Sequence, residues 1–463
     1  MRIGAIGAVI LLGLGVPARA QVDDGAVALG QLEGRPARSD LSPLQARVDE
    51  APAGSTVVVP PGTYRGDLFL DRPITLRAGG DVTLIGSGHG SVLRVRAPGV
   101  TIEGFTIDGQ KGGDLGRDSS GIHVTGADAT IRRCRIRNAI FGVYLRESSG
   151  TVVEDVEIVG IPGLDPGEKG SGIHLWNSQG FRLERNVIRD VRDGFYVQSS
   201  AGGVIRGNRV SDVRYGLHYM FSDDNLFEDN VFENGAAGAA LMYSQRIVFR
   251  RNQFIRNRGF ASVGLLLKAC DDVLAEDNLL ADNARGIFME GSSRNIVRRN
   301  VIAGSDAAVV LYDSVSKNQF ESNSFVSNRT PLLLVGTRTD TIFTGNYYTS
   351  NLEPDLDGDG ASDRAFTLGS VFDHFRGNVI AADLMVDTPA AEALGLAERT
   401  FPVLRKIAVA DDRPLAKAPL LPAVPVAARA RGAASRFGIA ISAALMVVAL
   451  AGFHLGQRPG GAS

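Results

Sequence analysis

Short runs in which apolar and polar residues alternate follow one another along most of this chain, and they recur with a regular period. Asparagines mark the period: Asn186, Asn208, Asn230 and Asn252 are each 22 residues apart. A repeat of this length cannot bury its own apolar side, so successive repeats must stack and share one core. Because parallel crossovers are almost always right-handed, the period predicts an all-β fold, a right-handed single-stranded parallel β-helix over residues 55–350.

The register of the predicted strands follows from the glycine or small residue that opens each one, as in the run from Gly216 to Met220. Strand side chains alternate between two faces, so Leu217 and Tyr219 should point into the core while His218 and Met220 point outward. The repeating asparagines fit turns that contain a left-handed residue, with their amides bonded to the copies in neighbouring repeats.

Two outward columns result, one from the second and one from the fourth residue after each glycine. Equivalent residues of one column, in neighbouring repeats, should lie about 4.8 Å apart. Over one half of the β-helix these columns gather histidine, aromatic and methionine side chains, which we expect to form a binding face. The members of interest are His123, Tyr144, His174, Trp176, Tyr196, His218, Met220 and Met242.

Copper ligands are the first chemical interpretation of this face. We expect His218, Met220 and Met242 within reach of one another, and His174 lies two repeats from His218. Imidazole and thioether ligands without cysteine suit a soft ion such as Cu(I). Stacking of side chains on neighbouring repeats would explain the same pattern and stays open. The longest insertions, residues 109–120 and 160–171, fall just before His123 and His174, so loops should overhang the face.

The competing function is an enzyme that cleaves or epimerises polysaccharide on such a face. That chemistry needs paired carboxylates at close spacing. The candidate pairs, Asp223–Asp224 and Asp271–Asp272, occupy turns where other repeats carry serine, and we interpret them as turn residues. No convincing catalytic constellation remains. We therefore expect a protein that is not an enzyme, with a lyase, epimerase or hydrolase as the alternative.

A second metal hypothesis rests on an acidic loop beyond the repeats. Asp355, Asp357, Asp359 and Asp363 occupy positions 1, 3, 5 and 9 of a calcium-loop spacing that has glycine at position 6. Position 12 is Phe366 instead of the usual glutamate. The sequence leaves a structural Ca²⁺ and a merely polar loop equally open.

The two ends of the chain suggest export and a membrane anchor. Residues 1–20 combine an arginine, an apolar run and a small-residue cleavage site, which predicts a secretory signal peptide. Residues 21–54 should include a short helix that closes the N-terminal end of the β-helix, with Ser42 as N-cap and Gln45 completing a capping box. Residues 351–421 lose the period and form an irregular region with the acidic loop, and residues 422–436 form a linker. The apolar run 437–456 is long enough to span a bilayer, with a peripheral or partner-buried helix as the alternative.

The charge of the chain argues against a nucleic-acid partner, and the positions of its cysteines argue against a disulfide. The net charge of −2 and the isoelectric point near 6.3 give no electrostatic case for a nucleic-acid partner. The two cysteines, Cys134 and Cys270, lie several repeats apart, too far for a disulfide. Cys134 occupies an asparagine position, which favours a buried structural role.

The run Leu217-His218-Tyr219-Met220-Phe221-Ser222-Asp223-Asp224-Asn225, followed by Gly238–Ser244, resembles the paired motif of the NosD family of periplasmic accessory proteins. The resemblance covers roughly residues 21–420. It implies a fold similar to the pectate-lyase-like solenoids of carbohydrate-binding proteins and sugar hydrolases, which carry CASH-type repeats. It also implies a periplasmic role in maturing the copper centre of nitrous-oxide reductase, together with an ABC-type ATPase, its membrane subunit and a copper chaperone.

The resemblance makes copper the implied, transient cofactor. It leaves open whether the chain itself ligates copper, delivers sulfur or only scaffolds the reductase and the chaperone. The sequence contains no glycine-rich nucleotide-binding loop, so ATP hydrolysis must belong to a partner. The apolar run near the C-terminus departs from the soluble pattern of the family and predicts a membrane-anchored periplasmic protein.

Overall fold

The computed structural model describes residues 41–259, 261–386, 388–400 and 409–419. The expected signal peptide (1–20), linker (422–436) and apolar run (437–456) lie outside these residues. Within the described ranges, no helix has both the length and the apolar character needed to cross a membrane.

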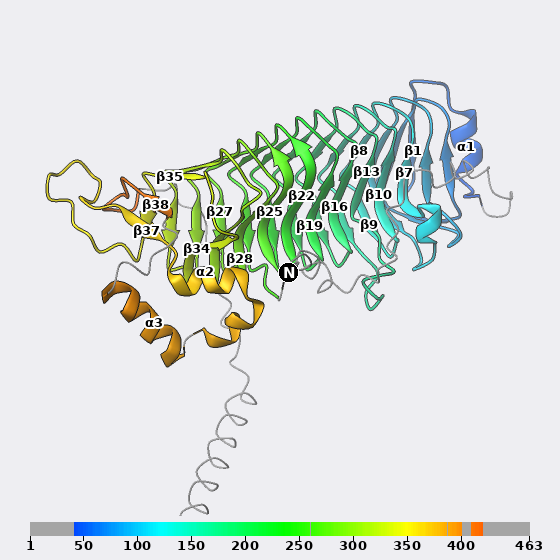
Figure 1. Ribbon diagram of the computed structural model, residues 1–463. Helices are drawn as coiled ribbons and strands as arrows, with labels where there is room; N and C mark the ends of the chain where they lie inside the picture. Colours follow the sequence, from blue (N-terminus) through cyan, green and yellow to red (C-terminus); the bar gives the residue numbers. More distant parts are fainter. Residues whose placement is uncertain (1–40, 260, 387, 401–408, 420–463) are drawn as a thin grey trace, which may run out of the picture. The chain divides into compact units, whose positions relative to one another are not determined.

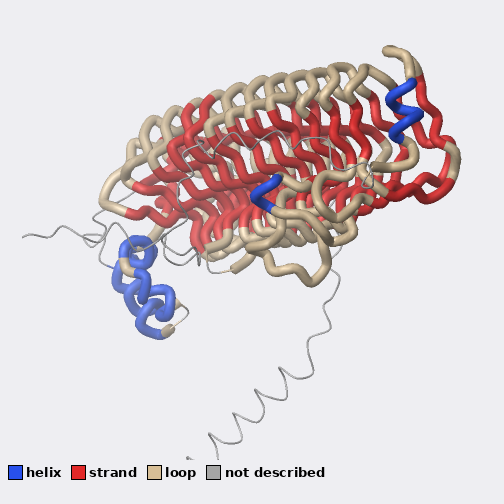
Figure 2. The backbone as a smooth tube through the Cα atoms, turned by 90° about the vertical axis from the view of Figure 1, so that its right-hand side faces the viewer, coloured by secondary structure: helices blue, strands red, loops and turns tan. Residues whose placement is uncertain are grey.

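One wall of the β-helix is a sheet of 12 parallel strands stacked side by side (Figures 1 and 2). Each strand comes from a different repeat and pairs with its copy in the next repeat. The strands are β3 (Leu68–Leu70), β5 (Leu93–Val95), β7 (Ser120–Val124), β10 (Phe141–Arg146), β13 (Ile173–Trp176), β16 (Asp193–Gln198), β19 (Tyr215–Met220), β22 (Ala237–Gln245), β25 (Val263–Asp271), β28 (Arg285–Glu290), β31 (Ala307–Tyr312) and β34 (Thr330–Val335).

The other strands form one sheet of 26, in which most repeats contribute two short strands joined by a turn. All of its pairings between named strands are parallel except β37–β38. Its strands are β1 (Thr56–Val59), β2 (Gly62–Arg65), β4 (Thr75–Ile85), β6 (Thr101–Asp108), β8 (Thr130–Arg132), β9 (Arg135–Arg137), β11 (Val152–Glu154), β12 (Glu157–Val159), β14 (Arg182–Glu184), β15 (Val187–Arg189), β17 (Val204–Arg206), β18 (Arg209–Ser211), β20 (Leu226–Glu228), β21 (Val231–Glu233), β23 (Val248–Arg250), β24 (Gln253–Ile255), β26 (Leu274–Glu276), β27 (Leu279–Ala281), β29 (Ile296–Arg298), β30 (Val301–Ala303), β32 (Gln319–Glu321), β33 (Ser324–Val326), β35 (Ile342–Thr344), β36 (Tyr347–Tyr348), β37 (Phe366–Leu368) and β38 (Val409–Asp411).

The predicted inward residues form the core. Leu217, Tyr219 and Leu241 are fully buried, as are their counterparts along the stack. The strand-opening glycine has a steric reason: a Cβ at Gly216 would lie 2.5 Å from the carbonyl oxygen of Gly238 and 2.6 Å from the Phe232 ring. Only glycine fits where the backbone passes this close to the next repeat.

Buried asparagines form a hydrogen-bonded ladder between the two short strands of each repeat, as the sequence predicts. The Nδ2 of Asn208 donates to Oδ1 of Asn230 at 2.9 Å, and the same bond joins Asn230 to Asn252 at 2.9 Å. The left-handed residue, however, is the one before the asparagine, such as Asp229 (φ 56°) or Arg251 (φ 55°). The turns therefore contain a left-handed residue, as predicted, and the asparagine that follows it directs its side chain along the ladder. Asp411 of β38 ends the ladder by accepting from the Asn346 backbone and side-chain nitrogens, both at 2.9 Å.

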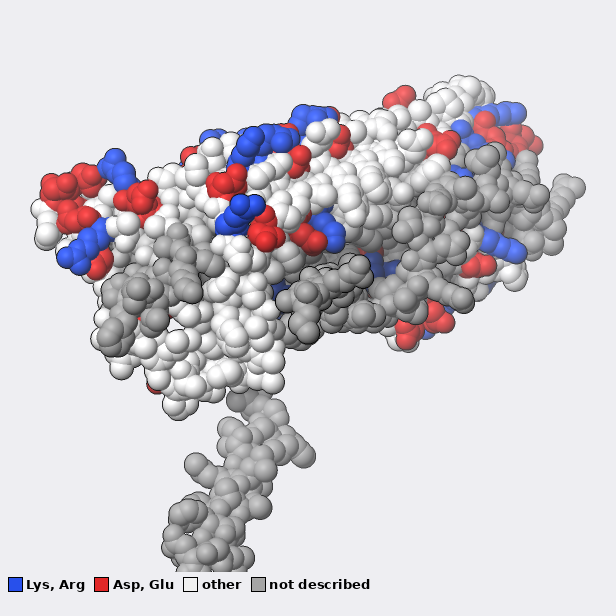
Figure 3. All heavy atoms as spheres, viewed as in Figure 1, with Lys and Arg blue, Asp and Glu red and all other residues white. Residues whose placement is uncertain are grey.

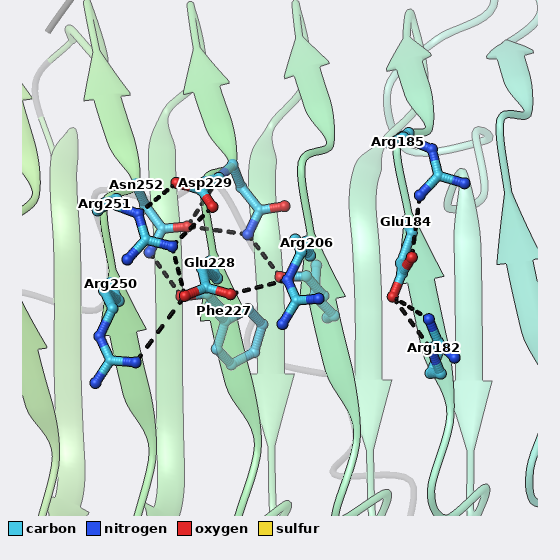
Figure 4. Close-up of polar contacts among 12 residues, drawn as sticks. Arg182, Glu184, Arg185, Arg206, Phe227, Glu228, Asp229, Arg250, Arg251 and Asn252 are labelled. Atoms are coloured by element: carbon cyan, nitrogen blue, oxygen red, sulfur yellow. Dashed lines mark hydrogen bonds and ion pairs between the residues drawn. The ribbon is translucent and has the colours of Figure 1, made fainter.

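A row of acidic and basic side chains covers the strands beside the asparagine ladder; we call it the charge lattice. Glu228 accepts from Arg206 at 2.8 Å and from Arg251 at 2.6 Å, and Figure 4 shows it between these two arginines. Figure 3 shows basic and acidic side chains interspersed on the visible face of the molecule. The charge lattice consists of Arg132, Glu154, Glu184, Arg206, Glu228, Arg250, Glu276, Arg298 and Glu321, which are partners in successive strands.

The expected N-terminal helix is α1 (Gln45–Glu50), but its start differs from the prediction. Leu44, not Ser42, precedes the helix, and no side chain caps it. Gln45 instead donates through Nε2 to the Phe69 carbonyl at 3.0 Å and accepts at Oε1 from the Phe69 N–H at 2.8 Å. A side-chain amide carries the same donor and acceptor as a peptide, so Gln45 satisfies the open edge of β3 as a further strand would.

The region after the repeats contains α2 (Val371–Asn378), the 3₁₀ helix η4 (Ile380–Met385) and α3 (Pro389–Thr400). Helix α2 begins with a capping box between Ser370 and Asp373. Asp373 also accepts from the Thr330 hydroxyl at 2.8 Å, and Asn378 accepts from the Gly336 backbone at 2.9 Å. These bonds fix α2 against β34, the last strand of the 12-stranded sheet. Cys134 and Cys270 are both buried and free, as expected.

Candidate functional site

The outward register predicted from the sequence is present on the 12-stranded sheet. His123, Tyr144, His174, Tyr196 and His218 are successive Cα partners in β7, β10, β13, β16 and β19. Their rings also contact one another in this order, with centroids 4.3–5.1 Å apart. We call these five residues the ring ladder.

Burial holds the first two histidines of the ladder neutral. The His174 ring lies between Tyr144 (4.4 Å, 7° between planes) and Tyr196 (4.3 Å, 15°). Burial lowers the pKa of His174 to about 3 and that of His123 to about 4, and nearby Arg94 adds to the second shift. Nδ1 of His174 and Nε2 of His123 are buried with no hydrogen-bond partner in the described part of the chain.

The two long insertions overhang this part of the face, as predicted. Leu115 belongs to the first insertion, which forms the short 3₁₀ helix η3 (Leu115–Arg117), and Leu164 belongs to the second. Both pack against a buried cluster that includes Phe141 and Tyr144. Figure 2 shows loops projecting from the stack of strands. At the margin of the same region the Arg146 guanidinium lies 5.3 Å from the Trp176 ring.

His218 ends the ring ladder in a different environment, because a buried carboxylate faces it. Its Nδ1 lies 3.2 Å from Oδ2 of Asp193, whose side chain is only 3% exposed. Arg214 donates to both oxygens of Asp193, from Nε at 2.9 Å and from Nη2 at 2.6 Å. Burial would raise the pKa of Asp193, but the hydrogen bonds from His218 and Arg214 outweigh it and leave the pKa below its usual value.

The methionines lie beside His218 in the expected register. Met220 shares strand β19 with His218, and Met242 of β22 is the direct partner of Met220. Both side chains are half-buried. The strand partner of His218 in β22 is the small residue Ala240. An imidazole and two thioethers are thus adjacent on one surface. His174 is separated from His218 by Tyr196, whose ring contacts both imidazoles.

Two exposed aromatic residues next to the methionines were not singled out by sequence reasoning. Phe221 follows Met220 and Tyr243 follows Met242, and these side chains are 56% and 49% exposed. Both residues are left-handed (φ 50° and 54°), a conformation that is uncommon for bulky residues, and their rings stack at 5.1 Å. In the other repeats this turn position carries a small or polar residue. Two aromatic residues there were therefore a sign in the sequence that this surface is unusual.

The acidic pairs of the enzyme hypothesis form structural bonds. Asp224 forms two hydrogen bonds with Arg246, at 2.7 and 2.9 Å, and Asp223 accepts from the Gln245 backbone at 3.0 Å. Asp272 forms the equivalent pair with Arg294. The hydrogen bond to arginine lowers the pKa of both Asp224 and Asp272. These carboxylates stay ionised and occupied, which suits turn residues better than a general acid.

The acidic loop brings three of its four candidate calcium ligands together. Asp355, Asp357 and Asp359 each have a carboxylate oxygen within 4.8 Å of the others. Asp359 is also paired with Arg413 at 2.7 Å, and Asp363 accepts from the Leu356 backbone at 2.8 Å. Phe366, at the position where a calcium loop has glutamate, stacks on Tyr348 at 4.3 Å. A cation here would compete with Arg413 for Asp359.

Comparison with known proteins supports the fold first. Residues 80–220 match the family model described as a right-handed β-helix region, which confirms the predicted handedness. Among solved structures, the chain is similar to the A-module of mannuronan C-5 epimerase AlgE6 from Azotobacter vinelandii, with a TM-score of 0.57 and 17% identity. That similarity covers 66% of this chain and 94% of the module, and at this identity it shows the fold alone.

Sequence relatives are more specific. Residues 159–354 match the family model described as "Periplasmic copper-binding protein (NosD)". A protein of Pseudomonas aeruginosa named "Probable ABC transporter binding protein NosD" is 34% identical, over 77% of this chain and 87% of its own length. A protein of the same name from Stutzerimonas stutzeri is 32% identical, over 78% of this chain and 86% of its own. This chain therefore belongs to the NosD family of periplasmic proteins.

Proposed function

We propose that this protein is a periplasmic accessory protein that takes up Cu(I) as transient cargo at His218, Met220 and Met242. It would act with an ABC-type ATPase and its membrane subunit, a copper chaperone and nitrous-oxide reductase, whose copper centre it helps to mature. The observation that carries the proposal is the position of His218, Met220 and Met242 on two adjacent strands, in register and facing outward. The names of the two relatives add the transporter partner.

The types of ligand atom at this site decide which metal ion it would bind. Thioethers are poor ligands for Zn²⁺ and Ca²⁺ but good ligands for Cu(I), so this group of side chains should discriminate among ions. Both methionines are half-buried, so part of each residue is accessible to an incoming ion. His174 would join the set only if the Tyr196 ring moved from between it and His218. His123, Tyr144, Trp176 and Tyr196 extend the proposed binding face toward the overhanging loops.

Two further proposals concern the ends of the chain. The apolar run 437–456 would anchor the protein to the membrane from the periplasmic side. The loop with Asp355, Asp357, Asp359 and Asp363 would hold a structural Ca²⁺, a hard ion for which carboxylate oxygens are suitable ligands.

The polysaccharide-modifying alternative is less well supported. The fold is shared with an epimerase module, but the acidic pairs of this chain are held in ion pairs with Arg246 and Arg294. The names of the relatives describe binding proteins. Activity on a polymannuronate or polygalacturonate substrate would revive the alternative.

The test compares the variant His218→Ala/Met220→Ala/Met242→Ala with the wild-type full chain. We expect Cu(I) binding, measured by competition with a chromophoric chelator, and maturation of the reductase to be lost together. A control, Lys268→Ala/Glu290→Ala, changes the next two residues of the Met220–Met242 column and should leave both unchanged. Normal maturation by the triple variant would refute the proposed role of these residues.

A further inference from the structure

The residue that distinguishes His218 from the other histidines of the ring ladder is Asp193. It is the first residue of β16, and its side chain is almost fully buried although it carries a carboxylate. The equivalent positions in the next three strands hold Tyr215, Ala237 and Val263, none of which is acidic. The carboxylate thus occurs one strand away from the histidine that adjoins the two methionines.

Arg214 fixes the position of this carboxylate. Its Nε and Nη2 donate to the two different oxygens of Asp193, at 2.9 and 2.6 Å, which is the planar two-bond geometry that guanidinium groups favour. The guanidinium also lies 4.4 Å from the Tyr215 ring centroid. With both oxygens bound and the arginine packed on a ring, the carboxylate can move little.

The contacts of His218 Nδ1 decide which ring nitrogen carries the proton. Nδ1 lies 3.2 Å from Asp193 Oδ2 and 3.4 Å from Arg214 Nη2. An unprotonated Nδ1 would direct its lone pair at a carboxylate oxygen, whereas a protonated Nδ1 donates to a charged acceptor. Arg214 Nη2 already donates to Asp193 at the shorter distance of 2.6 Å. The neutral imidazole is therefore the Nδ1–H tautomer, with its lone pair on Nε2.

We infer that Asp193, held by Arg214, is the positioning residue of the copper site. It orients the His218 ring and keeps the proton on Nδ1, so that Nε2 is the nitrogen offered to Cu(I). The inference rests on the proposed function and adds to it the donor atom and the residue that selects it. Carboxylates that accept from the distal N–H of a metal-bound histidine raise its affinity in many metal sites. Among the described residues, no carboxylate accepts a hydrogen bond from the unpaired ring nitrogen of His123 or of His174.

The first measurement is made on the full-length protein without metal. Long-range ¹H–¹⁵N correlation spectra of the imidazoles report the tautomer of each histidine, and His218→Gln assigns the signals of His218. We expect the Nδ1–H form in the wild type and a mixture of tautomers in Asp193→Asn, because an amide both donates and accepts. The wild type in the Nε2–H form, or an unchanged tautomer in the variant, would overturn the inference.

The second measurement is the affinity for Cu(I), with Ag(I) as a probe that cannot be oxidised. Asp193→Asn should bind both ions about 10–100-fold more weakly than the wild type. Glu276→Gln is the matched control, since it also removes a buried carboxylate that binds arginines, in a strand of the other sheet. Its affinity should not change. Unchanged affinity in Asp193→Asn, despite a changed tautomer, would also overturn the inference.

Asp193→Asn leaves Arg214 without its counter-charge, so a second variant guards against misfolding. Asp193→Asn/Arg214→Met removes both charges and should show the same mixture of tautomers and the same loss of affinity. If both variants keep full affinity, Asp193 has only a structural role. A wild-type protein that binds neither ion would refute the proposed copper site instead, and the tautomer spectra alone would then decide what Asp193 does to His218.

Discussion

Two outer faces of the same β-helix differ in how completely their polar side chains are bonded. In the charge lattice, Glu276 accepts from Arg250, Arg298 and Arg299, which come from the repeats on either side. In the ring ladder, His123 and His174 each bury a nitrogen without a partner among the described residues. An unpaired buried polar atom costs about 1–3 kcal/mol. The charge lattice is arranged for stability, whereas the ring ladder retains unpaired polar atoms, which agrees with the binding role proposed above.

The largest expected effect follows from this difference. Glu276→Gln leaves three arginines without a shared anionic partner and should lower the free energy of unfolding by about 3–5 kcal/mol. His174→Phe keeps a ring between Tyr144 and Tyr196 and removes an unpaired nitrogen, so its effect should stay within about 1 kcal/mol. Urea denaturation of both variants measures this.

Glu290→Gln is the control for the comparison, because its carboxylate is 35% exposed and paired with Lys268. Its loss should cost less than about 1 kcal/mol. If His174→Phe destabilised the protein more than Glu276→Gln, the two faces would not differ as described.

The methionines provide a smaller contrast between the interior and the binding face. Met289 is fully buried in β28, and Met289→Ala should cost about 2–5 kcal/mol through the cavity it leaves. Met242 is half-buried on the outer face, and we expect Met242→Ala to cost less than half as much while weakening Cu(I) binding. Met289→Ala should bind Cu(I) normally at temperatures where it is folded. Equal losses of stability would show that Met242 is a packing residue.

Acid sensitivity should separate the two faces by pH. The ordinary pKa of a glutamate is 4.5; burial opposes ionisation of Glu276, but hydrogen bonds from its arginines hold its pKa at about 2. Its contribution is therefore complete above pH 4.5 and is lost as the pH falls toward 2. Burial lowers the pKa of His123 from 6.5 to about 4, so the folded state binds fewer protons and stability falls between these values on acidification.

The two pH windows can be tested separately. His123→Phe should flatten the pH dependence of the unfolding free energy mainly between 6.5 and about 4, and Glu276→Gln mainly between 4.5 and about 2. The measurement is urea denaturation in a series of buffers. The same change in both variants across the whole range would contradict the assignment of the windows to these residues.

The smallest effect on stability is expected from the C-terminal end. Deleting residues from Ala434 onward should leave the unfolding of the β-helix unchanged, because its core lies within residues 44–368. The same deletion should move the signal-processed protein from membranes to the soluble periplasmic fraction. Full-length protein that already fractionates as soluble, without its partners, would refute the proposed anchor.

The sequence was sufficient to predict the outer columns because a strict repeat and a strand-opening glycine fix which residues face outward. That logic placed His218, Met220 and Met242 correctly beside one another. It could not identify Asp193, which precedes the opening glycine of its strand. Asp193 is the first residue of β16, and the alternation of faces counted from the glycine onward does not tell where a side chain before the glycine points.

Other misses have similar physical causes. Gln45 was assigned to a capping box because the local sequence fits one, but an open strand edge competed for its amide. Helix α2 was not foreseen, because it follows the last repeat and carries no periodic signal.

The central claim is that Cu(I) is bound by one imidazole and two thioethers on the outer face. X-ray absorption at the copper edge of the Cu(I)-loaded full chain tests it most directly, with methionine replaced by selenomethionine. The account predicts one nitrogen and two selenium neighbours, and loss of both selenium neighbours in Met220→Leu/Met242→Leu. A copper ion surrounded only by nitrogen and oxygen, or selenium neighbours that persist in that variant, would contradict it.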